Sequence, residues 1–274
     1  MDVLVNADDL GLNPEVNEAI FNMMADGIIT SASILANAPY VEEACARLES
    51  FPYCSFGVHL NVTEFNPLVP ADGLDSILND QGEFTKEGVR QAKIGNGLAE
   101  GIFREYCAQI ERLQELGVKL SHIDSHHYVH TIPRVFPILK KVQKLFQVRR
   151  VRITRNVYAD GLLKETGLSP YQLGIDPDLG DQDVSRALRL KKTLYNFMLR
   201  HYYSTKTTDG FSGFRLFYEL GKIHKMGQRT FEVVVHPANQ YYDAEEAEIL
   251  TGCWRNDMKF PVRLINDYDL VFTK

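Results

Sequence analysis

The stretch DVLVNADDLGLNPEVNEAIFNMMADGIITSASILA at residues 2–36 contains a strand, a helix and a second strand, in that order. Its apolar start predicts the first strand, and Asn13 followed by Pro14 places a capping residue and a proline where a helix begins. Apolar residues then recur at helical spacing as far as Gly27, which predicts the end of the helix. The apolar run after this glycine predicts the second strand, so the stretch is typical of a β/α unit.

The same alternation continues along the chain. Strands are expected at residues 2–6, 31–36, 55–60, 119–124, 149–154, 230–235 and 269–272. Helices are expected at residues 14–26, 41–50, 98–116, 133–146, 184–203 and 216–226, and a late helix after the capping pair Asp243 and Glu246. Residues 61–85 and 156–182 have no strong period, and the first of these segments is a candidate active-site loop.

Repeated alternation of strands and helices predicts a parallel sheet. Seven or eight mostly parallel strands in 274 residues fit a TIM-barrel-like (β/α) barrel better than a doubly wound sheet. No internal repeat and no linker rich in Pro, Gly or Ser divides the sequence, so we expect one α/β domain over residues 1–274.

The composition, with 45% hydrophobic and 24% charged residues, is that of an ordinary globular protein and excludes a disordered chain. A net charge of −6 without a basic run argues against a nucleic-acid partner. No stretch reaches the roughly 20 apolar residues that a membrane span needs. The acidic N-terminus is unlike a signal peptide and the four cysteines form no CxxC pair, so we expect reduced thiols and a cytoplasmic location.

Five predicted strands end in polar residues of catalytic type. At the ends of these strands lie Asn6, Asp8 and Asp9 (the first strand), His59 (the third), Asp124, His126 and His127 (the fourth), Arg155 (the fifth) and His236 (the apolar run at 230–235). The carboxyl ends of barrel strands converge on one face, where the active site is built. The sequence therefore predicts that these side chains meet in one pocket.

The residue types in this pocket suggest metal chemistry. One carboxylate of the pair Asp8 and Asp9 can bind a cation while the other transfers a proton; a turn cap beside a solvated carboxylate is the alternative. Four histidines fall within residues 122–130, and clustered imidazoles near an aspartate are how ligand shells are built; a hydrogen-bonded polar loop is the alternative. Arg155 either holds a polar or anionic substrate group or forms a surface ion pair.

Four segments of the sequence resemble one family. The segments NADDLGLNPEVNEAI at 6–20, GVHLNVT at 57–63, HIDSHHYVH at 122–130 and VVHPA at 234–238 are similar to motifs of the YdjC-like carbohydrate deacetylases, which include chitooligosaccharide deacetylases. The resemblance implies a TIM-barrel-like fold and a metal-dependent enzyme that removes N-acetyl groups from amino sugars in oligosaccharides. Tyr128 and Leu10 depart from the family pattern without removing a proposed ligand.

The resemblance also implies roles for individual residues. Asp9, His59 and His126 would bind the metal, Asp8 would be the general base and His236 the general acid. We expect Arg155, His127 and Asn6 to contact the substrate, and Asp124, His122 and His130 to support the ligands. Mg²⁺ is the first expectation for the metal, and Zn²⁺ or another transition metal is the alternative. A homodimer is common in the resembling family, although no feature of this sequence indicates one.

Three other functions fit parts of this pattern. A metal-dependent phosphohydrolase acting on a phosphorylated sugar also uses Asp and His clusters, with two metals about 3.5–4 Å apart. A non-catalytic sugar-binding protein on the same scaffold is the second alternative, although the full set of proposed site residues argues against it. A glycosidase is disfavoured, because nothing in the sequence identifies a second carboxylate at the required spacing from Asp8 and Asp9.

Overall fold

The computed structural model describes residues 1–158, 167, 185–238 and 244–266. Within these residues the strands form one seven-stranded sheet in the order β4-β3-β2-β1-β6-β5, and β7 pairs with the start of β1. The strands are β1 (Asp2–Leu10), β2 (Ser31–Ile34), β3 (Ser55–Leu60), β4 (Leu120–Ser125), β5 (Gly210–Gly213), β6 (Thr230–Val235) and β7 (Arg263–Leu264). Neighbouring strands pair in parallel, which confirms the predicted α/β fold with a parallel sheet.

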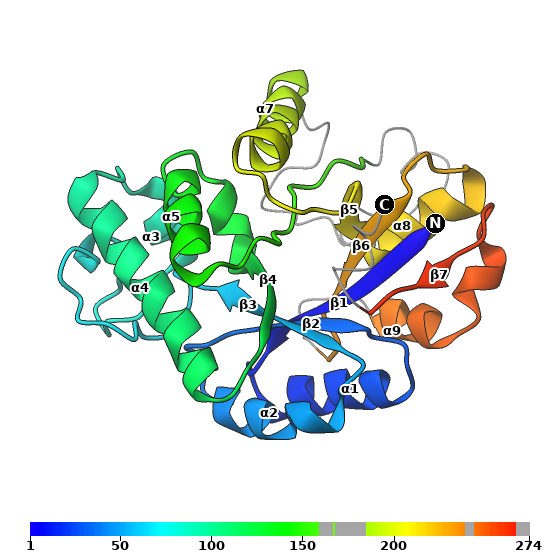
Figure 1. Cartoon of the computed structure of the whole chain (residues 1–274), viewed down its shortest axis with the longest axis horizontal. Coiled ribbons are helices and arrows are strands. Elements are labelled where there is room, and N and C mark those ends of the chain that lie inside the picture. Colours follow the sequence, from blue (N-terminus) through cyan, green and yellow to red (C-terminus); the bar gives the residue numbers. More distant parts are fainter. Residues whose placement is uncertain (159–166, 168–184, 239–243, 267–274) are drawn as a thin grey trace.

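Helices follow the strands and cover the outer side of the curved sheet (Figure 1). The longer helices are α1 (Pro14–Ala25), α2 (Val41–Arg47), α3 (Lys86–Gln91), α4 (Asn96–Glu115), α5 (Phe136–Phe146), α7 (Arg186–Phe197), α8 (Phe214–Ile223) and α9 (Ala244–Thr251). The helix α1 begins as predicted, with the Asn13 side chain accepting a hydrogen bond from the amide of Val16 at 2.8 Å and with Pro14 in the first turn.

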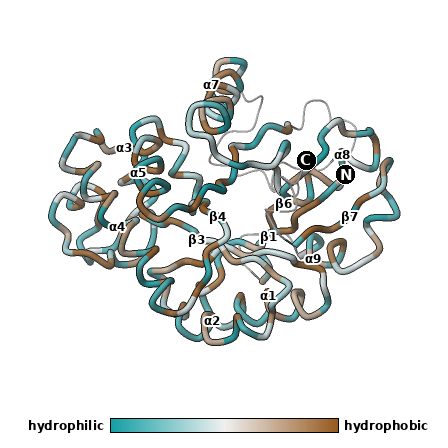
Figure 2. Tube along the Cα trace, in the orientation of Figure 1, coloured by the Kyte–Doolittle hydropathy of each residue, from teal (hydrophilic) through white to brown (hydrophobic). Residues whose placement is uncertain are grey.

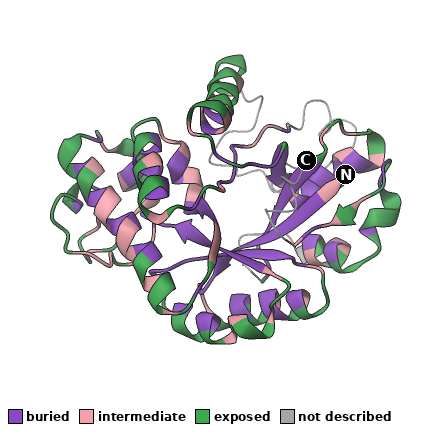
Figure 3. Ribbon diagram, viewed as in Figure 1, coloured by how far each residue is buried: buried purple, intermediate pink, exposed green. Residues whose placement is uncertain are grey.

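The core lies between the sheet and these helices. Strands β2, β3 and β6 are buried along their whole length, whereas the helices bury one side and expose the other (Figure 3). The helices accordingly alternate between hydrophobic and hydrophilic residues along their length (Figure 2). Helix α7 stands apart from this layer, above the opening of the curved sheet (Figure 1).

The fifth predicted strand, at 149–154, is reduced to isolated bridges. Val151 pairs with Ile123 of β4, and Arg150 pairs with Lys206, on the chain that leads into β5. These bridges extend the pairing past β4, so the arrangement is barrel-like; a closed barrel of seven or eight strands stays a prediction. The predicted strand at 269–272 and the cap at Asp243 lie outside the described residues.

Two strands were not predicted from the sequence. Strand β5 has four residues with a glycine at each end, and a Cβ atom at Gly210 would lie 2.3 Å from the ring of Phe231. Strand β7 has only two residues, and short strands carry too few residues to show a period. No helix within the described ranges is long and apolar enough to cross a membrane.

Candidate metal centre and active site

Asp8 and Asp9 lie near the end of β1, on the inner side of the curved sheet. The register of β1 against β2 shifts between Ala7 and Leu10, and Asp9 has a φ of 67°. This bulge breaks the alternation of faces that two neighbouring strand residues would otherwise follow, so Asp8 and Asp9 both reach the same group of side chains. Both aspartates are buried. A left-handed backbone at a buried aspartate is strained, and such strain is concentrated at functional sites.

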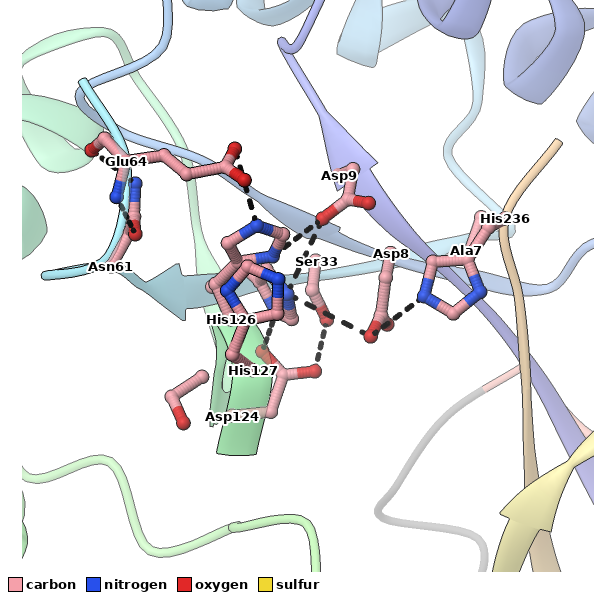
Figure 4. Close-up of polar contacts among 12 residues, drawn as sticks. Ala7, Asp8, Asp9, Ser33, Asn61, Glu64, Asp124, His126, His127 and His236 are labelled. Atoms are coloured by element: carbon pink, nitrogen blue, oxygen red, sulfur yellow. Dashed lines mark hydrogen bonds and ion pairs between the residues drawn. The ribbon is translucent and has the colours of Figure 1, made fainter. Parts of the chain in front are cut away.

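One oxygen of Asp9 faces two imidazoles, and Figure 4 marks these contacts with dashed lines. Its Oδ1 atom is 3.0 Å from His126 Nδ1 and 3.5 Å from His59 Nε2. Ligands that stand about 2.0–2.1 Å from one Zn²⁺ ion are roughly 3.0–3.5 Å from each other. One carboxylate and two imidazoles at this spacing therefore fit a divalent cation, and the three donors predicted from the sequence are brought together.

His59 is oriented from behind by Asp124. Its Nδ1 atom is 2.7 Å from Asp124 Oδ1, which leaves Nε2 directed toward Asp8 and Asp9. Burial disfavours the charged imidazolium, but the carboxylates of Asp124, Asp8 and Asp9 outweigh it, so the pKa of His59 is raised. A carboxylate behind a ligating histidine fixes the ring and its tautomer, so the expected supporting role of Asp124 matches this geometry.

His126 begins the short 3₁₀ segment η3 (His126–Thr131) directly after β4. Burial again disfavours its charged form, but Asp9 and the more distant Glu64 favour it, and the pKa of His126 rises to about 10. Its Nε2 atom lies 3.4 Å from Glu64 Oε2. Glu64 was not singled out from the sequence, because it lies in the long segment 61–85, where no period indicates which side chains face the site.

A buried arginine lies beneath the two aspartates and was missed by the sequence analysis. Arg152 donates to both carboxylate oxygens of Asp8, at 2.6 and 2.7 Å, and to Glu232 at 2.6 Å. It also lies 2.7 Å from Asp124 Oδ2. Arg152 thus faces three carboxylates and Asp9 adds a fourth, so this layer carries an excess of negative charge that a divalent cation would compensate.

The contacts of Asp8 select one of its oxygens for chemistry. Oδ1 accepts hydrogen bonds from Asn6 Nδ2 at 2.8 Å and from Arg152, whereas Oδ2 accepts one bond from Arg152. A carboxylate oxygen has two lone pairs, so Oδ2 keeps one acceptor position. This atom lies 3.7 Å from His59 Nε2 and 3.9 Å from His236 Nε2. Burial lowers the pKa of His236, although Asp9 and Asp8 partly oppose this effect.

The two remaining histidines of the cluster are buried beneath the site. His122 contacts Ser33 Oγ at 3.1 Å and Ser121 Oγ at 2.6 Å, and burial lowers its pKa to about 4. Gly57 of β3 makes room for this ring, since a Cβ atom there would lie 2.3 Å from His122 Nε2. His130 pairs with Ser125 Oγ, and burial lowers its pKa to about 4 as well. Both positions suit the supporting role expected of them.

The residues expected to contact substrate differ in their surroundings. His127 is half-buried, with its ring centroid 4.0 Å from that of His126 and its Nδ1 atom 2.9 Å from Thr63 Oγ1. Asn6 is fully buried and its side chain donates to Asp8 and Ser33, so it orients the aspartate and is not open to a substrate. The carbonyl of Arg155 accepts from Tyr158 Oη at 3.2 Å, and a substrate contact there stays a prediction.

Comparison with known proteins identifies the family. The model of the YdjC-like protein family matches residues 2–260. The chain belongs to the YdjC-like family. This assignment confirms the resemblance carried by the four sequence segments.

Two relatives show how far the likeness extends. A carbohydrate deacetylase of Geobacillus stearothermophilus is 36% identical over 180 residues, which cover 61% of this chain and 71% of the relative. A carbohydrate deacetylase of Vibrio cholerae is 34% identical over 149 residues, which cover 54% of this chain and 57% of the relative, so the match spans little more than half of that protein.

One solved structure has the same fold along nearly the whole chain. It is a protein of Enterococcus faecalis that is provisionally described as a cellobiose-phosphate cleavage protein. The match covers 98% of each chain, with a TM-score of 0.70. The two sequences are 21% identical, so this likeness bears on the fold alone.

Proposed function

We propose that this YdjC-like protein is a metal-dependent hydrolase that removes N-acetyl groups from acetylated amino sugars in short oligosaccharides. The observation that carries the proposal is the joint placement of Asp9, His59 and His126 within 4.8 Å of one another, with Asp8 Oδ2 beside them. The relatives named carbohydrate deacetylases support the same reaction. A cytoplasmic homodimer is the rest of the expectation, and it rests on the sequence and the family resemblance.

Asp9, His59 and His126 would hold the cation. We expect Mg²⁺ first, as in the resembling family, and Zn²⁺ or another transition metal as the alternative that two imidazoles favour. A bound divalent cation supplies a more acidic water and stabilises the negative charge that develops on the amide oxygen. The charge excess of the buried carboxylates around Arg152 supports binding of such an ion.

Proton transfer would be divided between Asp8 and His236. Asp8 Oδ2 has the acceptor position that a general base needs, and Arg152 and Asn6 fix its direction. His236 Nε2 faces this oxygen across 3.9 Å, where it can protonate the departing amine. Burial lowers its pKa below 6.5, so the ring is mostly neutral at neutral pH and must gain a proton before it can act as the general acid.

An assay of acetate release tests the proposal. The panel contains short β-linked N-acetylglucosamine oligomers, the free monosaccharide and phosphorylated forms of both, each with and without added Mg²⁺ or Zn²⁺. We expect acetate from a short oligomer only with metal, and less from the monosaccharide. An Asp8→Asn variant serves as the negative control. Release of phosphate without acetate would favour a sugar phosphohydrolase instead, and binding without turnover would favour a sugar-binding protein.

A further inference from the structure

Each imidazole of the candidate metal group has a carboxylate beside the nitrogen that does not face Asp9. Asp124 Oδ1 is 2.7 Å from His59 Nδ1, and Glu64 Oε2 is 3.4 Å from His126 Nε2. A ligating imidazole offers a lone pair on one nitrogen and keeps its proton on the other, and the partner of that proton sets the tautomer. Glu64 therefore occupies the position beside His126 that Asp124 occupies beside His59, although Asp124 makes a hydrogen bond and Glu64 lies at ion-pair distance.

We propose that Glu64 is a positioning residue of the metal centre. Its carboxylate accepts the Nε2–H of His126, which keeps Nδ1 unprotonated and directed toward Asp9. The inference deepens the proposed function and rests on its metal centre. Figure 4 shows the Glu64 carboxylate beside one ring nitrogen of His126 and the Asp9 carboxylate beside the other.

The backbone of Glu64 is held in place by Asn61. The Asn61 side chain accepts a hydrogen bond from the Glu64 amide at 3.2 Å and donates to the Glu64 carbonyl at 2.9 Å. Asn37 Nδ2 donates to the same carbonyl at 3.2 Å. Both backbone groups of Glu64 are thus fixed by buried side chains, and only its side chain can still adjust.

Helix α4 anchors this arrangement from beneath. Gln109 pairs with both backbone groups of Asn61, at 2.9 and 2.6 Å, and also donates to Glu105 at 2.8 Å. The second oxygen of Glu105 accepts from the amides of Leu68 and Val69. Glu105, Gln109 and Asn61 are fully buried, and a satisfied buried network of this kind makes a loop rigid. An ordinary surface loop would have no need of it.

Asp124 and Glu64 differ in exposure, and this difference predicts how much each carboxylate contributes to metal affinity. The side chain of Asp124 is fully buried, whereas that of Glu64 is 42% exposed and its contact with the imidazole is longer. Water screens an exposed contact, so Glu64 should contribute less to metal affinity than Asp124 does. Outer partners of metal-binding histidines typically change affinity by about 10- to 100-fold.

The experiment measures the Kd of Zn²⁺ by competition with a chromophoric chelator. We expect Glu64→Ala to weaken binding about tenfold, at the low end of that range, and Glu64→Gln to weaken it less, since glutamine keeps a neutral acceptor. The matched control is Glu100→Gln, which removes the same charge from an exposed position on α4 and should bind Zn²⁺ like the wild type. The melting temperature of the metal-free variants should stay unchanged.

A second readout follows the contact between Glu64 and His126 itself. In the Zn²⁺-bound proteins, with ¹⁵N-labelled histidine, the Nε2–H of His126 should exchange slowly with solvent in the wild type and faster in Glu64→Ala, because the carboxylate that accepts this proton is lost. Wild-type affinity and an unchanged His126 signal in Glu64→Ala would overturn the inference. So would a raised KM at unchanged Kd, which would make Glu64 a substrate contact. Two ions in the wild type and one in Glu64→Gln would make Glu64 a ligand.

The inference and the proposed function fail in different ways. If the wild type binds no Zn²⁺ and no Mg²⁺, the metal centre is wrong and both proposals fall. If the wild type binds one ion and releases acetate while Glu64→Ala binds equally well, only the role of Glu64 is wrong.

Discussion

The floor of the site and its mouth handle charge in different ways. The floor consists of Asp8, Asp124, Arg152 and Glu232, and the mouth consists of Glu64, His126 and His127. The contacts of Arg152 with the floor carboxylates are 2.6–2.7 Å long and fully buried. The contact between Glu64 and His126 at the mouth is 3.4 Å and half-exposed. The floor is therefore preorganised, whereas the mouth has room to adjust to an ion or a substrate.

The largest effect should come from the ligands between the two regions. Asp9→Asn or His59→Ala should abolish stoichiometric metal and, with it, acetate release, because each removes one of three donors. Elemental analysis of the purified variants measures the metal. His224→Ala, at an exposed histidine of the chain, is the control and should keep both properties.

Full metal content in both variants would contradict the ligand assignment. Metal loss in His59→Ala alone would leave His59 and His126 as ligands and reduce Asp9 to a neighbour. Either outcome would mean that metal binding does not depend on Asp9. This carboxylate contacts His126 of the mouth and His59, which in turn contacts Asp124 of the floor.

His236 tests whether the floor also performs proton transfer. Removal of a general acid typically lowers kcat by about 10²- to 10⁴-fold. We expect His236→Ala to show a loss of that order with little change in KM and with full metal content, because His236 faces Asp8 Oδ2 and is not one of the three donors of the metal group. Near-normal kcat would mean a histidine that only hydrogen-bonds at a strand end, and loss of metal would make it a ligand.

Arg152 tests how far the floor supports the fold. Loss of its guanidinium leaves buried carboxylates without their partner, which typically costs about 3–5 kcal/mol. We expect Arg152→Met to lower the free energy of unfolding by that order, and Arg152→Lys by less, as measured by urea denaturation. Arg263→Met, which breaks an exposed pair with Asp2, should stay close to the wild type. A stable Arg152→Met variant would show that the floor carboxylates do not all remain charged.

The convergence of the candidate ligands could be predicted from the sequence because of one geometric rule, whereas their roles as ligands came from the family resemblance. Asp9, His59 and His126 each lie at the carboxyl end of a strand, and parallel strands end on the same side of a sheet. This rule requires only that the strands be found, and β1, β3 and β4 are long enough to be seen. The same rule placed His236 beside Asp8 across 228 positions of sequence.

The floor could not be predicted by that rule. Arg152 and Glu232 lie inside strand-like segments, and the segment around Glu232 was interpreted as an almost wholly apolar strand. Two of the partners of Arg152, Glu232 and Asp8, lie 80 and 144 positions away along the chain, so the pairing depends on a register that the sequence does not contain. The available signal was a charged residue in the middle of an apolar run, since such a residue is rarely buried without a partner.

The smallest expected effect concerns pH and His130, which lies under the mouth. Burial lowers the pKa of His130 from 6.5 to about 4. Between pH 6.5 and pH 4 the His130 ring is therefore protonated in the unfolded chain and neutral in the folded chain. The stability due to this group is thus present above about pH 6.5 and is lost as the pH falls toward 4. At pH 4.5 the loss should be about 2.5 kcal/mol. His130→Gln cannot take up a proton, so its free energy of unfolding should fall less between pH 7 and 4.5 than that of the wild type, both measured metal-free in urea. Subtracting the two curves also removes the opposite effects of His59 and His126, whose raised pKa values favour the folded state as the pH falls. Parallel curves would show that His130 is protonated in the folded protein, and the layer beneath the mouth would then be less tightly closed than the floor.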